Sequence, residues 1–181
     1  MMLGLDISTS CTGWCVIGPD GKLIKMGYIS LKNDKSPFKK AKKVRQVLGS
    51  INIDYDIEHI CIEENLQAFR PGLSSAKTLL TLARFNGVIS YLAQEEFCIS
   101  PVFINVNSAR KSLGIKIKRK KDGGSPTKDQ VFDWVRSQVS ENYPWPTKVL
   151  KSGPRKGKKI HEPYCFDMAD AYVIARSGLI I

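Results

Sequence analysis

Short apolar runs separated by turn residues, and then longer amphipathic stretches, alternate along the first part of the chain. Apolar runs of this length, bounded by Gly, Pro, Asp and Ser, are typical of β-strands. The sequence PDGK at Pro19–Lys22 predicts a tight hairpin turn, so the first three strands should form an antiparallel meander. The predicted strands cover residues 2–9, 12–18, 23–31, 58–66 and 101–106.

Apolar residues recur at helical spacing in four other segments. The first of these begins with Ser36 and Pro37, a favourable helix start. Because helices separate the last two predicted strands from the meander, those strands should be parallel to their neighbours in a mixed sheet. The pattern predicts a single α/β domain over residues 1–181. The predicted helices cover residues 36–50, 73–95, 127–140 and 166–175.

Two segments interrupt this pattern, at residues 110–128 and 148–159. Both are basic and rich in Gly, Pro and Ser, which predicts mobile insertions on the surface. Within the first, the sequence GIKIKRKK alternates Ile and Lys, which favours a small β-ribbon with a basic face.

The chain carries a formal net charge of +11. So large an excess on a small protein favours a polyanionic partner, with nucleic acid ahead of an acidic membrane surface, although a merely soluble basic surface is the alternative. Five cysteines without metal-site spacing indicate free thiols in a reducing compartment. Without a signal peptide or a membrane-length apolar run, we expect a cytoplasmic protein with no membrane partner.

Carboxylates stand at three separated places that the predicted fold can bring together. Asp6 ends the first strand, Glu63 and Glu64 lie near the end of the fourth, and Asp167 and Asp170 share one side of the last helix. If the two strands are neighbours, these acids converge, and divalent cations would remove the cost of burying them together. Oxygen ligands without a histidine cluster indicate magnesium or manganese. Two such ions can hydrolyse a phosphodiester.

Each acid also has an ordinary explanation. Asp6 can be a turn residue, Glu63 can belong to a solvated strand end, and Asp167 can be a first-turn acid of its helix. Asp170 is harder to explain in this way, because it lies one turn inside an apolar helix between two alanines. Taken jointly, the acids favour a metal site.

Three motifs resemble those of RuvC-type Holliday junction resolvases of the ribonuclease H-like superfamily, especially the short bacteriophage versions. They are LGLDISTSCTGWCVI, ICIEENL and DMADAYVIA. The resemblance implies a ribonuclease H-like fold, with a five-stranded mixed sheet, an antiparallel meander followed by parallel strands, flanked by helices. It also implies that the family's catalytic, metal-binding acids correspond to Asp6, Glu63, Asp167 and Asp170. If phage-encoded, as the short versions are, the protein is expected in the host cell cytoplasm.

The activity that the resemblance implies is that of a crossover junction endodeoxyribonuclease. Such an enzyme is a homodimer that binds branched DNA and nicks two opposing strands of a four-way junction symmetrically. Its cofactor would be Mg²⁺, with Mn²⁺ expected to substitute and two ions in each active site. The predicted helix 73–95 matches the dimer helix of the family, although ordinary core packing also explains it.

Residues that would hold DNA are predicted in two places. After the fourth strand, Phe69 beside Arg70 is the candidate for the family's base-stacking aromatic, although Phe69 can equally pack under its loop. Clusters of basic residues bind phosphates with little dependence on the nucleotide sequence. The alternative is that they are simply solvated charges on the surface. Lys128 opens a helix in the sequence KDQV, which resembles a family segment with a phosphate-contacting lysine. The other predicted DNA contacts are Arg110, Lys111, Lys116, Lys118, Arg119, Lys120 and Lys121. The second basic segment is also expected to contact DNA, as a cluster and not through any single lysine, with Lys148, Lys151, Arg155, Lys156, Lys158 and Lys159.

Three other functions compete with junction resolution. A ribonuclease H acting on RNA–DNA hybrids, or a general branched-DNA nuclease, would use the same acids on the same fold. An actin-like or sugar-kinase ATPase is suggested by GLDISTSCTG, but that family needs two lobes and a longer chain. A DNA-binding module without catalysis would need none of the acids.

Overall fold

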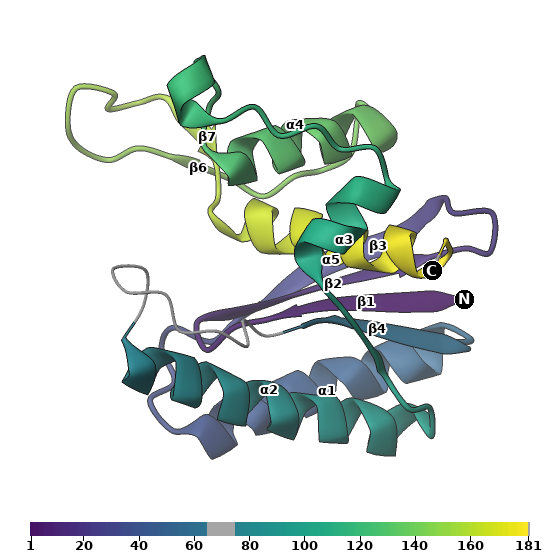
Figure 1. The fold of residues 1–181 in the computed structure, drawn as a ribbon. Helices are drawn as coiled ribbons and strands as arrows, with labels where there is room; N and C mark the ends of the chain where they lie inside the picture. Colours follow the sequence, from purple (N-terminus) through teal and green to yellow (C-terminus); the bar gives the residue numbers. More distant parts are fainter. Residues whose placement is uncertain (65–74, 181) are drawn as a thin grey trace.

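The computed structural model describes residues 1–64 and 75–180, and its centre is a five-stranded mixed sheet with the strand order β3-β2-β1-β4-β5 (Figure 1). The first three strands are antiparallel, whereas β4 is parallel to β1 and β5 is parallel to β4. The predicted α/β fold with its mixed sheet is therefore confirmed. The strands are β1 (Met2–Ile7), β2 (Cys11–Ile17), β3 (Leu23–Ser30), β4 (His59–Glu63) and β5 (Val102–Ile104).

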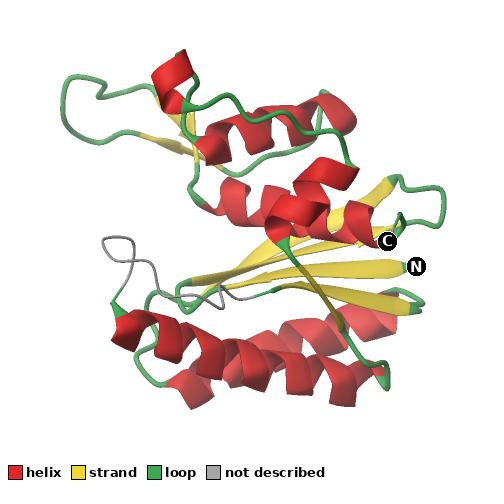
Figure 2. Ribbon diagram, viewed as in Figure 1, coloured by secondary structure: helices red, strands yellow, loops and turns green. Residues whose placement is uncertain are grey.

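Helices cover both faces of this sheet (Figures 1 and 2). The long helices α1 (Pro37–Asp54) and α2 (Ala76–Phe97) lie on one face. Helix α5 (Tyr164–Gly178) lies against the other face, and α3 (Val106–Ser112) and α4 (Thr127–Gln138) pack on α5. None of the described helices combines the length and apolar character needed to cross a membrane.

Along each strand, side chains point alternately to the two faces of the sheet, so alternate residues contact different helices. In β1, Leu3, Leu5 and Ile7 point into the core shared with α1 and α2. The intervening positions, Gly4 and Asp6, point toward α5. Asp6 is the last residue of β1 that points toward α5. Its carboxylate therefore lies on the α5 face of the sheet, at the C-terminal end of the strand.

Glycine brings α5 unusually close to the sheet. A Cβ at Gly13 would collide with the backbone carbonyl oxygen of Asp167, and one at Gly4 would collide with that of Ala171. Both strand positions therefore need glycine for packing, because backbone cannot move away as a flexible side chain can. The result is a helix whose backbone lies directly on β1 and β2.

Two predictions for the basic segments need correction. Residues 114–121 form no β-ribbon: the backbone of Lys118 is paired with the Gln130 side chain of α4, and a short 3₁₀-helix follows at Lys120–Asp122. The segment packs Ile115 into the core instead of pairing with a strand. Conversely, the second basic segment is not plain loop, because β6 (Thr147–Val149) and β7 (Lys159–His161) pair as an antiparallel hairpin. Helix α3 was also not predicted.

Candidate active site

The ends of β1 and β4 bring two of the predicted acids together. Leu5 pairs with Ile62 in the parallel register, so Asp6 and Glu63 follow on neighbouring strands. Cys61 packs in the core on the α5 side and Ile62 in the core on the α1 and α2 side. Alternation then directs Glu63 toward α5, whereas Glu64 follows after the strand has ended. This orientation favours Glu63 over Glu64 as the member of the acidic group.

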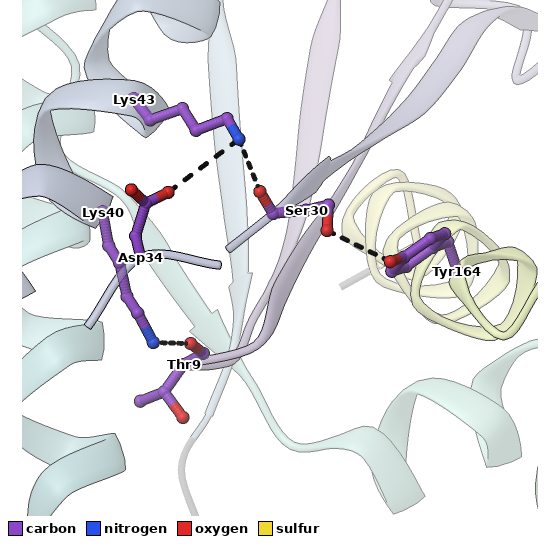
Figure 3. Close-up of polar contacts among 6 residues, drawn as sticks. All are labelled: Thr9, Ser30, Asp34, Lys40, Lys43 and Tyr164. Atoms are coloured by element: carbon purple, nitrogen blue, oxygen red, sulfur yellow. Dashed lines mark hydrogen bonds and ion pairs between the residues drawn. The ribbon is translucent and has the colours of Figure 1, made fainter. Parts of the chain in front are cut away.

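Helix α5 brings the other two acids to the same place, and its first turn is held firmly against β3. The ring of Tyr164 stacks on that of Tyr28 with 4.4 Å between centroids. The hydroxyls of Tyr164 and Ser30 share a hydrogen bond of 3.1 Å (Figure 3). One turn further along the helix, the backbone of Asp167 lies against Gly13. These contacts set the position of Asp167 and, a turn later, of Asp170.

Lysines of α1 hold the strand ends around the site (Figure 3). The Lys40 ammonium donates to the backbone carbonyl of Thr9, in the turn that follows β1. Lys43 donates to the carbonyl of Ser30 at 2.8 Å and lies 4.0 Å from Asp34. The turn after Asp6 and the end of β3 are thereby tied to a helix on the opposite face of the sheet.

Burial and mutual repulsion disfavour the charged forms of the strand acids. Burial raises the pKa of Asp6 well above its usual value, with further increases from Glu63, Asp170 and Asp167. Burial, and then the charge of Asp170, raises the pKa of Glu63 to about 7. All four residues are partly exposed, so solvent reaches the edge of the acidic group. The four acids thus behave as one electrostatic unit.

One guanidinium partly offsets this negative charge. Arg110 of α3 donates to Asp170 at 3.3 Å, with 18% of its own side chain exposed and 21% of that of Asp170. Burial raises the pKa of Asp170, and Arg110 opposes that increase. The buried Nε of Arg110 has no hydrogen-bond partner among the described residues. Arg110 therefore faces the acidic group, although the sequence pattern had assigned it to a surface segment that contacts DNA.

A small cavity opens beside the helix acids. It has a volume of about 280 Å³, and Asp167, Asp170, Lys32 and Lys128 contribute to its lining. Burial raises the pKa of Asp167, while a hydrogen bond from the Cys11 thiol and the charges of Lys128 and Lys32 act in the opposite direction. The cavity therefore combines two carboxylates with two ammonium groups.

The donor chemistry of the acidic group fits a hard divalent cation. All four side chains offer carboxylate oxygens, and their repulsion and desolvation would be relieved by positive charge. As the side chains lie, no three His, Cys, Asp or Glu residues within the described ranges are gathered tightly enough to hold a metal ion. Asp170 is instead paired with the Arg110 guanidinium.

The other predicted DNA contacts lie in different surroundings. Phe69 and Arg70 fall outside the described residues. Lys128 is exposed and lies 5.5 Å from the ring centre of Phe166, next to the acidic cavity. The remaining predicted contacts are all exposed: Lys111, Lys116, Lys118, Arg119, Lys120 and Lys121.

Sequence reasoning missed one cation of this site, Lys32, and did not predict the partner of another, Arg110. Lys32 follows β3 and lies 4.9 Å above the ring of Tyr164, so its place depends on the packing of α5 against β3. Arg110 was identified, but its pairing with Asp170 depends on the unpredicted helix α3. No local pattern signals either arrangement, because both join segments far apart in the chain.

Comparisons with known proteins find relatives by structure alone. No protein-family model matches the sequence, and no curated protein matches it. Thermus thermophilus RuvC matches with a TM-score of 0.61 and 16% identity, over 97% of this chain and 91% of that one. RuvC of T. thermophilus in complex with a Holliday junction substrate gives 0.60 and 15%, over 97% and 90%.

A third solved structure comes from a eukaryote. The yeast mitochondrial Holliday junction resolvase Ydc2 matches with a TM-score of 0.56 and 17% identity, over 98% of this chain and 77% of that one. Together with the strand order and the five-stranded mixed sheet, these matches show that the chain has the ribonuclease H-like fold of the RuvC-type Holliday junction resolvases.

Proposed function

We propose that this protein is a metal-dependent endodeoxyribonuclease that resolves four-way DNA junctions. The observation that carries the proposal is the group of four carboxylates, Asp6, Glu63, Asp167 and Asp170, at one end of the sheet of a resolvase-type fold. A net charge of +11 supports a nucleic-acid substrate, because cations elsewhere on the surface can bind the phosphates that the acids would repel.

The four carboxylates would hold two Mg²⁺ ions, or Mn²⁺ in their place. When bound, such ions activate water and neutralise charge on the phosphate that is cut. The protein's own cations have separate tasks. Lys32 and Lys128, beside Asp167, bind and orient phosphates entering the cavity. Arg110 favours the ionised form of Asp170, because it opposes the rise in the pKa of that carboxyl that burial causes.

Symmetric nicking of two strands requires two active sites, and α2 offers a surface for a homodimer. Three large side chains on α2 are exposed: Leu80 by 59%, Val88 by 45% and Tyr91 by 60%. With Gly87 they form a stripe at helical spacing, where the missing side chain of Gly87 would let a partner helix approach. Phe38 of α1, 82% exposed, lines an adjoining groove of about 630 Å³. An exposed apolar surface of this extent favours contact with a second copy of the protein.

The dimer proposal is tested by sedimentation. Val88→Glu should leave a folded monomer at micromolar concentration that binds DNA but no longer makes paired nicks. Ile24→Glu is the matched control, because Ile24 is 41% exposed but lies on β3, away from α2. A wild-type monomer, or a dimer unaffected by Val88→Glu, would contradict the proposed interface.

The activity itself is tested with one substrate panel. We expect the protein with Mg²⁺ to cut a synthetic four-way junction, and to leave it intact in EDTA. A flap substrate and an RNA–DNA hybrid in the same panel address the alternative of a broader branched-DNA or hybrid nuclease, which the same acids could serve. Equal cutting of all three would favour that alternative, and cutting of none would reject the nuclease proposal.

A further inference from the structure

The β6–β7 hairpin carries a concentration of positive charge that the proposed active site does not use. Its strands and the loop between them, residues 147–161, contain no acidic residue. Lys148 lies 3.3 Å from Glu162, and the other cations make no ion pair with any described residue. These other cations are all exposed: Lys151, Arg155, Lys156, Lys158 and Lys159.

The base of the hairpin is fixed to the helices that surround the acidic group. Phe132 of α4 packs edge-on against Trp145, His161 and Phe166, with centroid distances of 4.8, 5.1 and 5.6 Å. The backbone N–H of Glu162 donates to the carbonyl of Pro146 at 2.8 Å, which closes the base. Aromatic contacts of this kind stabilise a defined orientation.

The tip of the hairpin is folded as well. The N–H of Gly157 and that of Leu150 donate across the loop to the carbonyls of Leu150 and Lys158. Gly153 and Gly157 have φ angles of 80° and 83°, which an L-residue rarely adopts. The basic side chains are therefore presented on a turn with defined backbone hydrogen bonds.

The hairpin is also close to the acidic group along the chain. Strand β7 ends at His161, α5 begins at Tyr164, and Asp167 lies in the first turn of α5. In Figure 1 the loop projects from the end of the molecule at which α5 begins. At about 3.3 Å per extended residue, the path from Pro163 to Lys156 spans at most roughly 23 Å.

The amino-acid composition of the hairpin tip indicates which kind of polyanion it binds. The sequence from Lys151 to Lys158 is KSGPRKGK, which contains no aromatic or large aliphatic side chain. A membrane-binding segment usually adds apolar side chains that enter the bilayer, so phosphates of nucleic acid are the better partner. A rise of about 3.4 Å per base pair places the contact up to about six or seven base pairs from the cleaved bond.

We propose that the β6–β7 hairpin is a DNA-binding arm that contacts phosphates of one duplex arm of the junction, several base pairs from the phosphodiester that is cut. The inference rests on the proposed function for its substrate. The arm contributes to the affinity for junction DNA and not to the rate of the chemical step.

The test compares two charge-removing double variants. Lys156→Gln/Lys158→Gln alters the hairpin tip. Lys22→Gln/Lys25→Gln is the control, because these lysines lie around the start of β3, at the end of the sheet opposite Asp6. Binding of the full-length protein to a four-way junction with long arms is measured over a range of salt concentrations in Ca²⁺ or EDTA, followed by hydroxyl-radical footprinting.

We expect the hairpin variant to reduce the slope of log K against log salt by about 1 to 2, since each phosphate contact contributes about 0.9. Protection should disappear at phosphates of one duplex arm within about seven base pairs of the cleaved bond, while the control retains both slope and footprint. The cleavage rate at saturating protein should match that of the wild type.

An unchanged slope and footprint in the hairpin variant, or an equal loss in the control, would overturn the arm alone. A wild-type protein that binds junctions through the hairpin but never cuts them would reject the proposed nuclease and leave the arm standing. A wild-type protein that does not bind DNA would overturn both.

Discussion

The two faces of the central sheet differ in how closely a helix approaches them and in what the strand ends carry. Toward α1 and α2 the strands present large aliphatic side chains, including Leu3, Leu5 and Ile62, which are fully buried. The α5 face also buries an apolar core, which includes Met2 and Cys15. On that face, however, glycines bring α5 against the sheet, and the ends of β1 and β4 carry carboxylates. Both faces gain stability from apolar burial, whereas the α5 face also places acids where neither solvent nor a counter-charge fully compensates them.

Apolar burial explains how the protein tolerates a group of acids that lowers its stability. Burying a large aliphatic side chain contributes about 1.5–3 kcal/mol, and the α1 and α2 side has many of them. Apolar side chains of both cores therefore offset the cost of the acidic group. Variants at the acidic group and at the glycine contacts should separate its chemistry from the stability of the fold.

The largest expected effect is on catalysis, from Asp6→Asn or Asp170→Asn. Each removes a proposed cation ligand, so junction cleavage should fall by about 10³-fold or more, while binding changes little. Cleavage is measured on denaturing gels and binding by titration in the absence of Mg²⁺. Asp54→Asn, at the exposed end of α1, is the control and should cut at the normal rate. Full activity in either site variant would contradict the assignment.

The next effect is on stability, from Gly13→Ala. The new Cβ meets the backbone of Asp167, so α5 must shift, and we expect a loss of about 3 kcal/mol or more in the free energy of unfolding. Urea titration measures this. On the other face, a Cβ at Gly49 would meet the Glu96 carboxylate at 3.4 Å, an ordinary contact. Gly49→Ala should therefore be neutral or stabilise by up to about 1 kcal/mol. Equal effects would refute the contrast between the faces.

A smaller effect depends on pH. Because burial raises the pKa of Glu63 to about 7, the folded state holds more protons than the unfolded state between the ordinary value of 4.5 and that pKa. In EDTA, stability from this group should therefore be lost as the pH rises through that window. Glu63→Gln removes the effect, so its Tm should exceed that of the wild type by roughly 5 °C at pH 8.

Thermal unfolding at pH 4.5 and pH 8 checks this prediction. At pH 4.5 the difference between Glu63→Gln and the wild type should largely vanish, because the wild-type carboxyl is then protonated in the folded state. Addition of Mg²⁺ should raise the Tm of the wild type at pH 8 more than that of the variant. A difference independent of pH would show that repulsion among the acids is not its cause.

The smallest effect is expected from Arg110→Gln. Arg110 lowers the pKa of Asp170 and opposes the increase at Glu63 and Asp6. Without it, these acids should hold protons to higher pH, so cleavage should fall severalfold at pH 6 and approach the wild-type rate at pH 9. A pH–rate profile checks this, with Lys111→Gln as the neighbouring control. A uniform loss at all pH values would instead indicate a direct role for Arg110 in binding DNA.

The sequence predicted the sheet well, and for a clear reason. Strands such as β1 combine apolar periodicity with turn residues at their ends, and both signals are local. The order of strands and helices then restricts the topology, which was enough to place Asp6 beside Glu63. The two acids within the apolar pattern of the last helix led to the prediction that this helix packs beside Asp6 and Glu63.

What the sequence did not predict depends on contacts between distant segments. The basic stretch at 114–121 has the alternation of a strand, but the side chain of Gln130 satisfies its backbone instead. The β6–β7 hairpin has strands of only three residues, too short for a periodic signal. Lys32 and Arg110 reach the acidic group through packing of α5 and α3, which no single segment encodes.

The position of α5 along the chain has a consequence during synthesis. Asp6 and Glu63 emerge from the ribosome early, but Asp167 and Asp170 follow only after a hundred further residues have been translated. A nascent chain therefore holds half of the proposed ligands and no α5 to close the sheet. On this reading, nuclease activity cannot arise until translation has passed α5 and the helix has docked on Gly4 and Gly13, so an incomplete chain would leave the cell's DNA uncut.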